Sequence, residues 1–140
     1  TQLAPGPQEV VLKTEQPYVQ VVQDLRSARM ALGRGALIGD AACAARPHAA
    51  AGTAKAAADA WALRDALLAA DDVEAALSAW EPGQLELSAA LLSRVVAMGE
   101  RSQVHGTWTP GDPELRFGLY GSGVTERPSA HSDAALAPTH

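Results

Sequence analysis

The sequence is poor in residue types that several common protein functions need. One cysteine in 140 residues excludes an internal disulfide framework and fits a reducing, cytoplasmic location. Lysine and arginine number 11 against 16 aspartate and glutamate residues, which gives a net charge of -5, and no basic stripe is present. Nucleic acid is therefore not an expected partner, because neutralising its phosphates requires clustered positive charge.

A long hydrophobic run and a signal peptide are also missing. Charged residues interrupt the apolar stretches, which are largely alanine, so we expect no membrane-spanning helix and no membrane partner. The first residue is Thr1 rather than methionine, and Pro5-Gly6-Pro7 follows closely, which we interpret as a cut or trimmed end. The length suits one domain with a real core.

Short strands are expected in the first part of the chain, after a linker over residues 1–8. Glu9–Thr14 alternates apolar and polar residues and Tyr18–Gln23 is rich in β-branched and aromatic ones, so each predicts a strand. Gly33-Arg34 predicts a turn into a third strand at Ala36–Ile38. Three short strands do not make a well-protected sheet, so we expect partner strands elsewhere.

Two long helices are expected after these strands. Thr53–Ala70 predicts the first, and Asp71 is the expected N-cap of the second. The second helix crosses Pro82, as one kinked helix or two nearly collinear ones, and ends near Gly99. Each helix has one apolar stripe: Ala56, Ala60, Leu63, Leu67 and Ala70 on the first, and Val73, Leu77, Trp80, Leu87, Leu91, Val95 and Met98 on the second. The predicted fold class is α+β, with a few short strands, two long helices and a disordered tail over 121–140.

The loop between the third strand and the first helix carries the most informative polar residues. Gly39-Asp40 ends the apolar run, Arg46-Pro47-His48 follows in a loop of small residues, and Gly52 precedes the helix. This order gathers backbone N–H groups and positive dipole charge at one point, which suits an anionic or oxygen-rich ligand. The Asp40 carboxylate would accept hydrogen bonds from ligand hydroxyls, or would only cap the following turn.

These residues resemble a known cofactor motif. Gly39-Asp40-Ala41-Ala42, then Pro47-His48, Gly52 and the pair Asp59-Ala60, is similar to the second FAD-binding motif of the single-component flavin-dependent aromatic hydroxylases. The resemblance covers most of the chain. Within that family, Arg46-Pro47-His48 and the segment from Arg101-Ser102-Gln103 to Trp108 look most like the 2,6-dihydroxypyridine 3-monooxygenase branch.

The resemblance implies an NAD(P)H-dependent monooxygenase that hydroxylates an electron-rich aromatic or N-heteroaromatic ring through a flavin hydroperoxide. FAD would supply that chemistry, so no protein nucleophile is needed. The resemblance places Asp40 at the ribityl and pyrophosphate side of FAD, and Pro47 with the turn before the helix beside the flavin ring. The cofactor contacts implied are Gly39, Asp40, Pro47, Gly52 and Thr53.

The resemblance also implies a division of the chain into four segments. Residues 1–32 would be the end of a substrate-domain sheet and its return strand, and 33–70 the second FAD-binding motif. Residues 71–120 would form a C-terminal helical segment, and 121–140 the tail.

Two motifs of the family are absent from the chain, the Asp-Gly motif and a glycine-rich turn. The Gly-x-Gly-x-x-Gly turn that binds the ADP pyrophosphate is missing, and Gly33-x-Gly35-x-x-x-Gly39 has the wrong spacing. We therefore expect a C-terminal piece that needs an absent N-terminal nucleotide-binding half and is inactive alone, with a homodimer as a possible assembly. The alternatives are a truncated, non-catalytic remnant, or a helical interaction module that docks through Trp61, Trp80 and the leucine stripe.

Several polar residues also have plainer interpretations. His48 would contact flavin or substrate, or be a surface or structural histidine. Arg46 would steer an anionic ring or an NAD(P)H phosphate, or, the more expected of the two, form a salt bridge with a neighbouring carboxylate. Cys43 is expected as a small buried residue rather than a metal ligand, so no metal is predicted. Lys55 and Asp59, four residues apart, are expected as a solvated helix pair.

Overall fold

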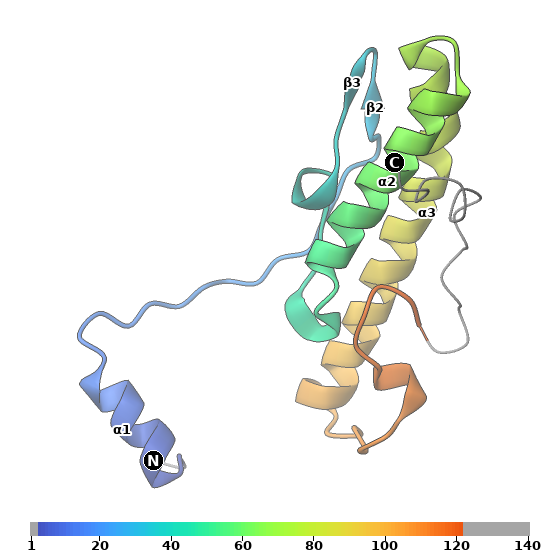
Figure 1. Ribbon diagram of the computed structural model, residues 1–140. Helices are drawn as coiled ribbons and strands as arrows, with labels where there is room; N and C mark the ends of the chain where they lie inside the picture. Colours follow the sequence, from blue (N-terminus) through green and yellow to red (C-terminus); the bar gives the residue numbers. More distant parts are fainter. Residues whose placement is uncertain (1–2, 122–140) are drawn as a thin grey trace, which may run out of the picture.

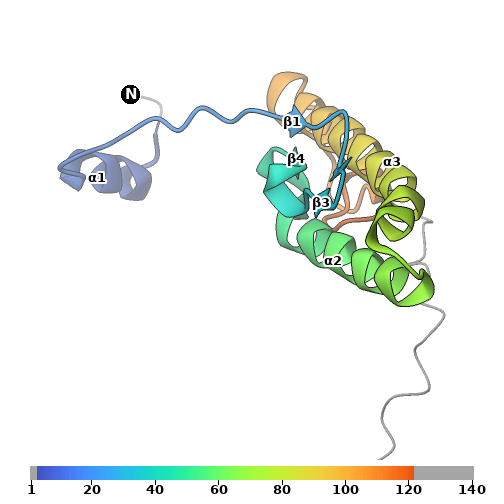
Figure 2. The same cartoon turned by 90° about the horizontal axis from the view of Figure 1, so that it is seen from above.

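Two long helices dominate the computed structural model, which describes residues 3–121 (Figure 1). Helix α2 spans Gly52–Ala69 and helix α3 spans Val73–Gly99. The short link between them turns the chain back, so the two helices pack side by side and antiparallel (Figures 1 and 2). None of the described helices is long and apolar enough to cross a membrane.

Helix α3 begins and ends close to the predicted positions. Its N-cap is Asp72 rather than Asp71, because the Asp72 carboxylate accepts hydrogen bonds from two first-turn N–H groups at 2.8 and 3.1 Å. The helix continues past Pro82, so of the two alternatives a single helix is observed. A turn of π-helix, η3 (Glu100–Val104), follows directly after Gly99.

Within residues 3–121, four short strands accompany the helices in two antiparallel pairs. Strand β1 (Leu25–Arg26) pairs with β4 (Cys43–Ala44), and β2 (Ala31–Leu32) pairs with β3 (Gly35–Ala36). The predicted turn between β2 and β3 is confirmed, and Gly33 adopts the positive φ of +57° that such a tight turn requires. The third predicted strand is shorter than expected and starts one residue earlier. The α+β fold class is confirmed.

The N-terminal prediction is wrong. Helix α1 (Pro5–Lys13) occupies half of the predicted linker and all but the last residue of the predicted strand Glu9–Thr14. An i,i+4 ion pair between Lys13 and Glu9 at 2.6 Å supports this helix. Within residues 3–121 no strand pairs with Tyr18–Gln23, which has no assigned strand or helix. A strand needs a paired edge, and both views show this segment and α1 away from the helix pair (Figures 1 and 2).

Two apolar clusters are built on helix α3, one along each half. The first-half cluster joins α3 to the β2–β3 hairpin and contains Met30, Ala31, Ala42, Leu77 and Trp80. The second-half cluster joins α3 to the loop before α2 and contains Ala49, Ala51, Leu91, Val95, Met98 and Leu115. Between them along α3 lies the buried, polar Ser88.

The predicted stripe is confirmed on α3 and wrong on α2. Five members of the α3 stripe are buried, and the other two are partly buried. On α2, Ala60 and Leu67 are exposed instead, and the fully buried positions are Lys55 and Asp59. Most of the predicted tail, residues 122–140, lies outside the described part of the chain.

Candidate functional site

The Gly39-Asp40 turn rests directly on helix α2. It forms a short 3-10 helix, η1 (Gly39–Ala41), after the β2–β3 hairpin. Gly39 is buried with φ +58°, and a Cβ atom there would lie 3.1 Å from the Ala56 Cβ. Only glycine accommodates both this backbone conformation and this close approach. The next side chain, Asp40, is exposed at the surface.

A buried ion pair lies beneath this turn. Lys55 and Asp59 have side chains that are 1% and 0% exposed, with Nζ and Oδ2 2.6 Å apart. The same Oδ2 accepts a hydrogen bond from the Gly39 backbone N–H at 2.9 Å, and the indole N–H of Trp80 donates to the Asp59 carbonyl at 3.2 Å. The predicted solvated pair is therefore wrong, because η1 and α3 pack against this face of α2.

The start of α2 presents backbone donors at the surface. A second 3-10 turn, η2 (Pro47–Ala49), leads into it through Ala50, which adopts a left-handed φ of +50°. Gly52 and Thr53 are exposed, and among residues 3–121 no side chain caps this helix start. The first N–H groups of a helix have no intrahelical acceptor, so this end can donate to a ligand and carries positive dipole charge.

The loop before η2 is fixed by a salt bridge. Arg46 donates from its backbone N–H to Asp24 Oδ1 at 2.9 Å and from Nε to Oδ2 at 2.8 Å, with a third bond from its Nη2 at 2.5 Å. The predicted salt bridge is confirmed. The hydrogen bonds from the Arg46 guanidinium hold the pKa of the Asp24 carboxyl below its usual range.

His48 belongs to η2, and its ring lies against the end of α3. Its ring packs so closely on Gly99 that a Cβ there would lie 2.9 Å from the imidazole Cε1. Its Nδ1 is buried and has no hydrogen-bond partner among the described residues. The side chain as a whole is half-buried, so it is held by packing against the α3 terminus.

The single cysteine is a small buried residue, as predicted. Cys43 is 4% exposed, with Sγ 3.9 Å from the Ser88 carbonyl oxygen. Burial raises the pKa of its thiol, which makes the thiolate, the metal-binding form, unfavourable. In the described part of the chain no three potential metal-binding side chains gather.

A different acidic residue fixes the hairpin that carries the turn. Glu81 Oε1 on α3 accepts hydrogen bonds from the backbone N–H groups of Met30 at 2.6 Å and Ala31 at 2.8 Å. These bonds, chiefly those from Ala31 and then Met30, lower the pKa of the Glu81 carboxyl. The hairpin is therefore tied to α3 at its start and to α2 at its end.

The C-terminal segment holds the loop before α2 from the other side. Arg94 donates to the carbonyl oxygens of Arg116, Gly118 and Tyr120, and the Gly118 N–H donates to the Ala49 carbonyl at 2.7 Å. We call residues 113–121 the strap; it starts with a 3-10 turn, η4 (Pro113–Leu115). The sequence analysis missed this arrangement, because nothing in the spacing of a single arginine indicates which carbonyl groups it binds.

Comparison with known proteins shows what the chain is similar to. No family model matches the chain. It is 44% identical over 111 residues to 2,6-dihydroxypyridine 3-monooxygenase of Paenarthrobacter nicotinovorans, covering 79% of this chain and 28% of that protein. The solved structure of 2,6-dihydroxypyridine-3-hydroxylase from Arthrobacter nicotinovorans matches with a TM-score of 0.66 and 42% identity, covering 76% of this chain and 26% of that one. This chain is homologous to part of such an enzyme.

The resemblance to the 2,6-dihydroxypyridine 3-monooxygenase branch is thus confirmed in sequence and in structure. The chain spans about a quarter of the length of these monooxygenases, by the coverage values of 28% and 26%. The two relatives are a monooxygenase and a hydroxylase by name.

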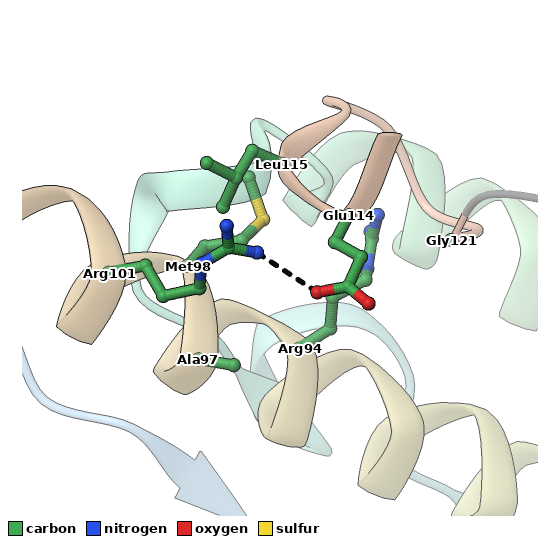
Figure 3. Close-up of a pocket in the computed structure, with 7 residues that line it drawn as sticks. All are labelled: Arg94, Ala97, Met98, Arg101, Glu114, Leu115 and Gly121. Atoms are coloured by element: carbon green, nitrogen blue, oxygen red, sulfur yellow. Dashed lines mark hydrogen bonds and ion pairs between the residues drawn. The ribbon is translucent and has the colours of Figure 1, made fainter. Parts of the chain in front are cut away.

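Two hollows in the described part of the chain lie away from the Gly39-Asp40 turn. One, of about 240 Å³, lies between α3 and the strap, where Arg101 pairs with Glu114 at 2.9 Å (Figure 3). The other, of about 670 Å³, lies between α2, α3 and residues 119–121. The predicted cofactor contacts line neither hollow. Asp40, Pro47, Gly52 and Thr53 are exposed, whereas Gly39 is buried against α2.

Proposed function

We propose that residues 33–70 form half of the FAD site of an NAD(P)H-dependent monooxygenase that hydroxylates an electron-rich aromatic or N-heteroaromatic ring. The observation that supports this most directly is the turn that exposes Asp40 while Gly39 is anchored on α2. The homology to a 2,6-dihydroxypyridine 3-monooxygenase agrees with it. The proposed cofactor contacts are Gly39, Asp40, Pro47, Gly52 and Thr53.

The chemistry of these groups fits FAD. The exposed Asp40 carboxylate offers acceptors for the ribityl hydroxyls, and the N–H groups at the start of α2 offer donors for oxygen atoms with negative charge. Pro47 gives η2 a rigid start next to these donors. When bound, FAD supplies oxygen activation after reduction by NAD(P)H. The chain itself binds and orients, and His48 is the candidate for an additional contact.

The rest of the site belongs to the proposal as well. A nucleotide-binding half would supply the pyrophosphate turn, and residues 1–32 and 71–120 would contribute the end of a substrate-domain sheet and a supporting helical segment. The whole enzyme would act in the cytoplasm, as a monomer or a homodimer.

One observation favours the helical interaction module as a second candidate, but not with the docking residues expected from the sequence, because Trp80 and most of the leucine stripe are buried in the core. Trp61 and Leu68 lie seven residues apart on one face of α2 and are 64% and 78% exposed, and large apolar side chains that share an exposed face mark an interaction surface. In an intact monooxygenase the same face would contact the absent half, so both proposals predict a partner here. They differ in whether that partner brings flavin binding with it.

A flavin titration tests the proposal. The chain is titrated with FAD while flavin fluorescence is followed, both alone and joined to the nucleotide-binding half of the Paenarthrobacter relative. We expect a Kd below about 10 μM, or roughly -7 kcal/mol, for the joined protein and weaker binding for the chain alone.

The variants identify the residue responsible. Asp40→Ala should weaken FAD binding about 10- to 100-fold, because it removes charge-assisted hydrogen bonds that contribute about 1.5–3 kcal/mol. Asp71→Ala, another exposed aspartate, is the matched control and should bind as the wild type does. Folded protein that binds no FAD in either form would refute the proposal and leave the interaction module.

A further inference from the structure

The pair Lys55 and Asp59 is the most deeply buried charge in the described residues, and it touches the candidate site. Its two side chains are 1% and 0% exposed, and the Asp59 carboxylate bonds both Lys55 Nζ and the Gly39 N–H. One oxygen atom of a helix side chain therefore links α2 to the residue that precedes Asp40 in the chain.

Stability alone explains this pair poorly. Burying two charges removes them from water, and a buried ion pair is often no more stabilising than apolar side chains of the same volume. The neighbouring clusters on α3 show that apolar residues fill this interior well. The second carboxylate oxygen, Oδ1, is buried with no partner among the described residues, which adds a further cost. The pair is better explained by the geometry it imposes.

That geometry is specific. Gly39 adopts a φ of +58° and lies close to Ala56, so the turn packs directly on α2. The hydrogen bond to Asp59 fixes the position of the turn along this helix. The Trp80 indole on α3 donates a hydrogen bond to the Asp59 carbonyl, so a second helix also holds the residue that anchors Gly39. Asp40 follows one residue later and projects at the surface.

We propose that Lys55 and Asp59 are positioning residues for flavin binding. Asp59 fixes Gly39, and through it the direction of the Asp40 carboxylate relative to the start of α2, while Lys55 balances the buried charge. This inference rests on the proposed function. It assigns a role in ligand binding to two side chains that the ligand cannot touch, because both are buried.

Two double variants separate the hydrogen bond from the charges. Lys55→Met with Asp59→Asn removes both charges and keeps an oxygen that accepts from the Gly39 N–H. Lys55→Met with Asp59→Leu removes the charges and the acceptor together. Lys13→Met with Glu9→Leu removes an exposed i,i+4 pair far from the site and serves as the control.

Two measurements are made on each folded variant, well below its melting temperature. Amide hydrogen exchange at Gly39, resolved among the 12 glycines by selective isotope labelling, reports the hydrogen bond without any flavin. FAD titration, in whichever form of the wild type binds FAD, reports the consequence. We expect the Asn variant and the control to stay within about 3-fold of the wild type. In the Leu variant, the amide exchange rate at Gly39 and the Kd for FAD should each rise at least 10-fold. A 10-fold change in Kd corresponds to about 1.4 kcal/mol.

Each outcome decides between the two proposals. A Leu variant with unchanged Gly39 exchange, or with faster exchange but unchanged FAD affinity, would overturn the positioning role and leave the flavin proposal intact. A wild type that binds no FAD in either form would overturn the proposed function, and the positioning role with it. Loss of affinity in the Asn variant as well would show that the charges, not the hydrogen bond, matter, and would also overturn the inference.

Discussion

Removing Lys55 alone should destabilise the chain strongly. Lys55→Met would leave the Asp59 carboxylate, which is 0% exposed, with only the Gly39 N–H as a bonded donor. Breaking a buried pair by removing one partner costs about 3–5 kcal/mol, because the remaining charge is uncompensated. At about 1.4 kcal/mol per tenfold, the unfolded fraction should rise by roughly two to three and a half orders of magnitude.

The double variant Lys55→Met with Asp59→Asn should recover most of this loss. It contains no buried charge, and the amide oxygen can still accept from the Gly39 N–H. We therefore expect its free energy of unfolding to lie within about 1–2 kcal/mol of the wild type, well above that of the single variant. Such a large difference between single and double variants is the signature of a coupled pair.

Urea unfolding followed by tryptophan fluorescence measures these free energies. Trp80 is 4% exposed and its indole N–H bonds the Asp59 carbonyl, so its emission reports on the pair directly. Trp61 and Trp108 are 64% and 52% exposed and should change less. A single variant as stable as the wild type would refute the reasoning, since it would mean that the Asp59 charge is not buried in solution.

Three further substitutions test the contacts around the site. Glu81→Gln should lower the free energy of unfolding at neutral pH and make it depend less on acid. Because the folded pKa of Glu81 is lowered, the stabilisation by its carboxylate is present above about pH 4.3, where the unfolded carboxyl titrates. That stabilisation is lost as the pH falls through the lower folded pKa. Asp24→Asn should change the free energy of unfolding in the same direction, because Arg46 lowers the pKa of Asp24. Urea unfolding between about pH 3 and pH 7 measures both variants. A variant whose unfolding free energy changes with pH as steeply as that of the wild type would contradict the prediction for that residue. Gly39→Ala should cost about 1–2 kcal/mol of unfolding free energy, since an L-residue at φ +58° is strained and its Cβ would meet Ala56; an unchanged urea midpoint would show that the turn relaxes.

Local sequence patterns predicted the parts of the fold that local forces determine. The α3 stripe was predictable because its apolar residues recur at helical spacing along nearly the whole helix, which is 27 residues long. The hairpin turn was predictable because Gly33 supplies a conformation that other residues rarely adopt. The Arg46 salt bridge was predictable as a type of contact, although its partner, Asp24, is 22 residues away and was not.

The N-terminal error has a different cause. Residues 9–14 alternate over too few positions to distinguish a strand from a helix, and a strand there would need an edge that residues 3–121 do not provide. Pro5 and Pro7, in the first turn of α1, were the available signal for a helix start. The strap was missed because its contacts are backbone carbonyl groups, which any sequence presents.

The buried pair shows why the apolar face of α2 could not be found from its sequence. Alanine occupies both faces of this helix, so apolar periodicity is weak, and a Lys–Asp pair at i,i+4 is ordinarily a surface feature. The pair is buried because Gly39, 20 residues upstream of Asp59, packs over it. Once the turn is buried, the Gly39 N–H needs a hydrogen-bond acceptor. The carboxylate meets that need and the lysine neutralises the carboxylate. The two charges are therefore explained together with the Gly-Asp turn, and only the folded chain shows that they belong to the same site.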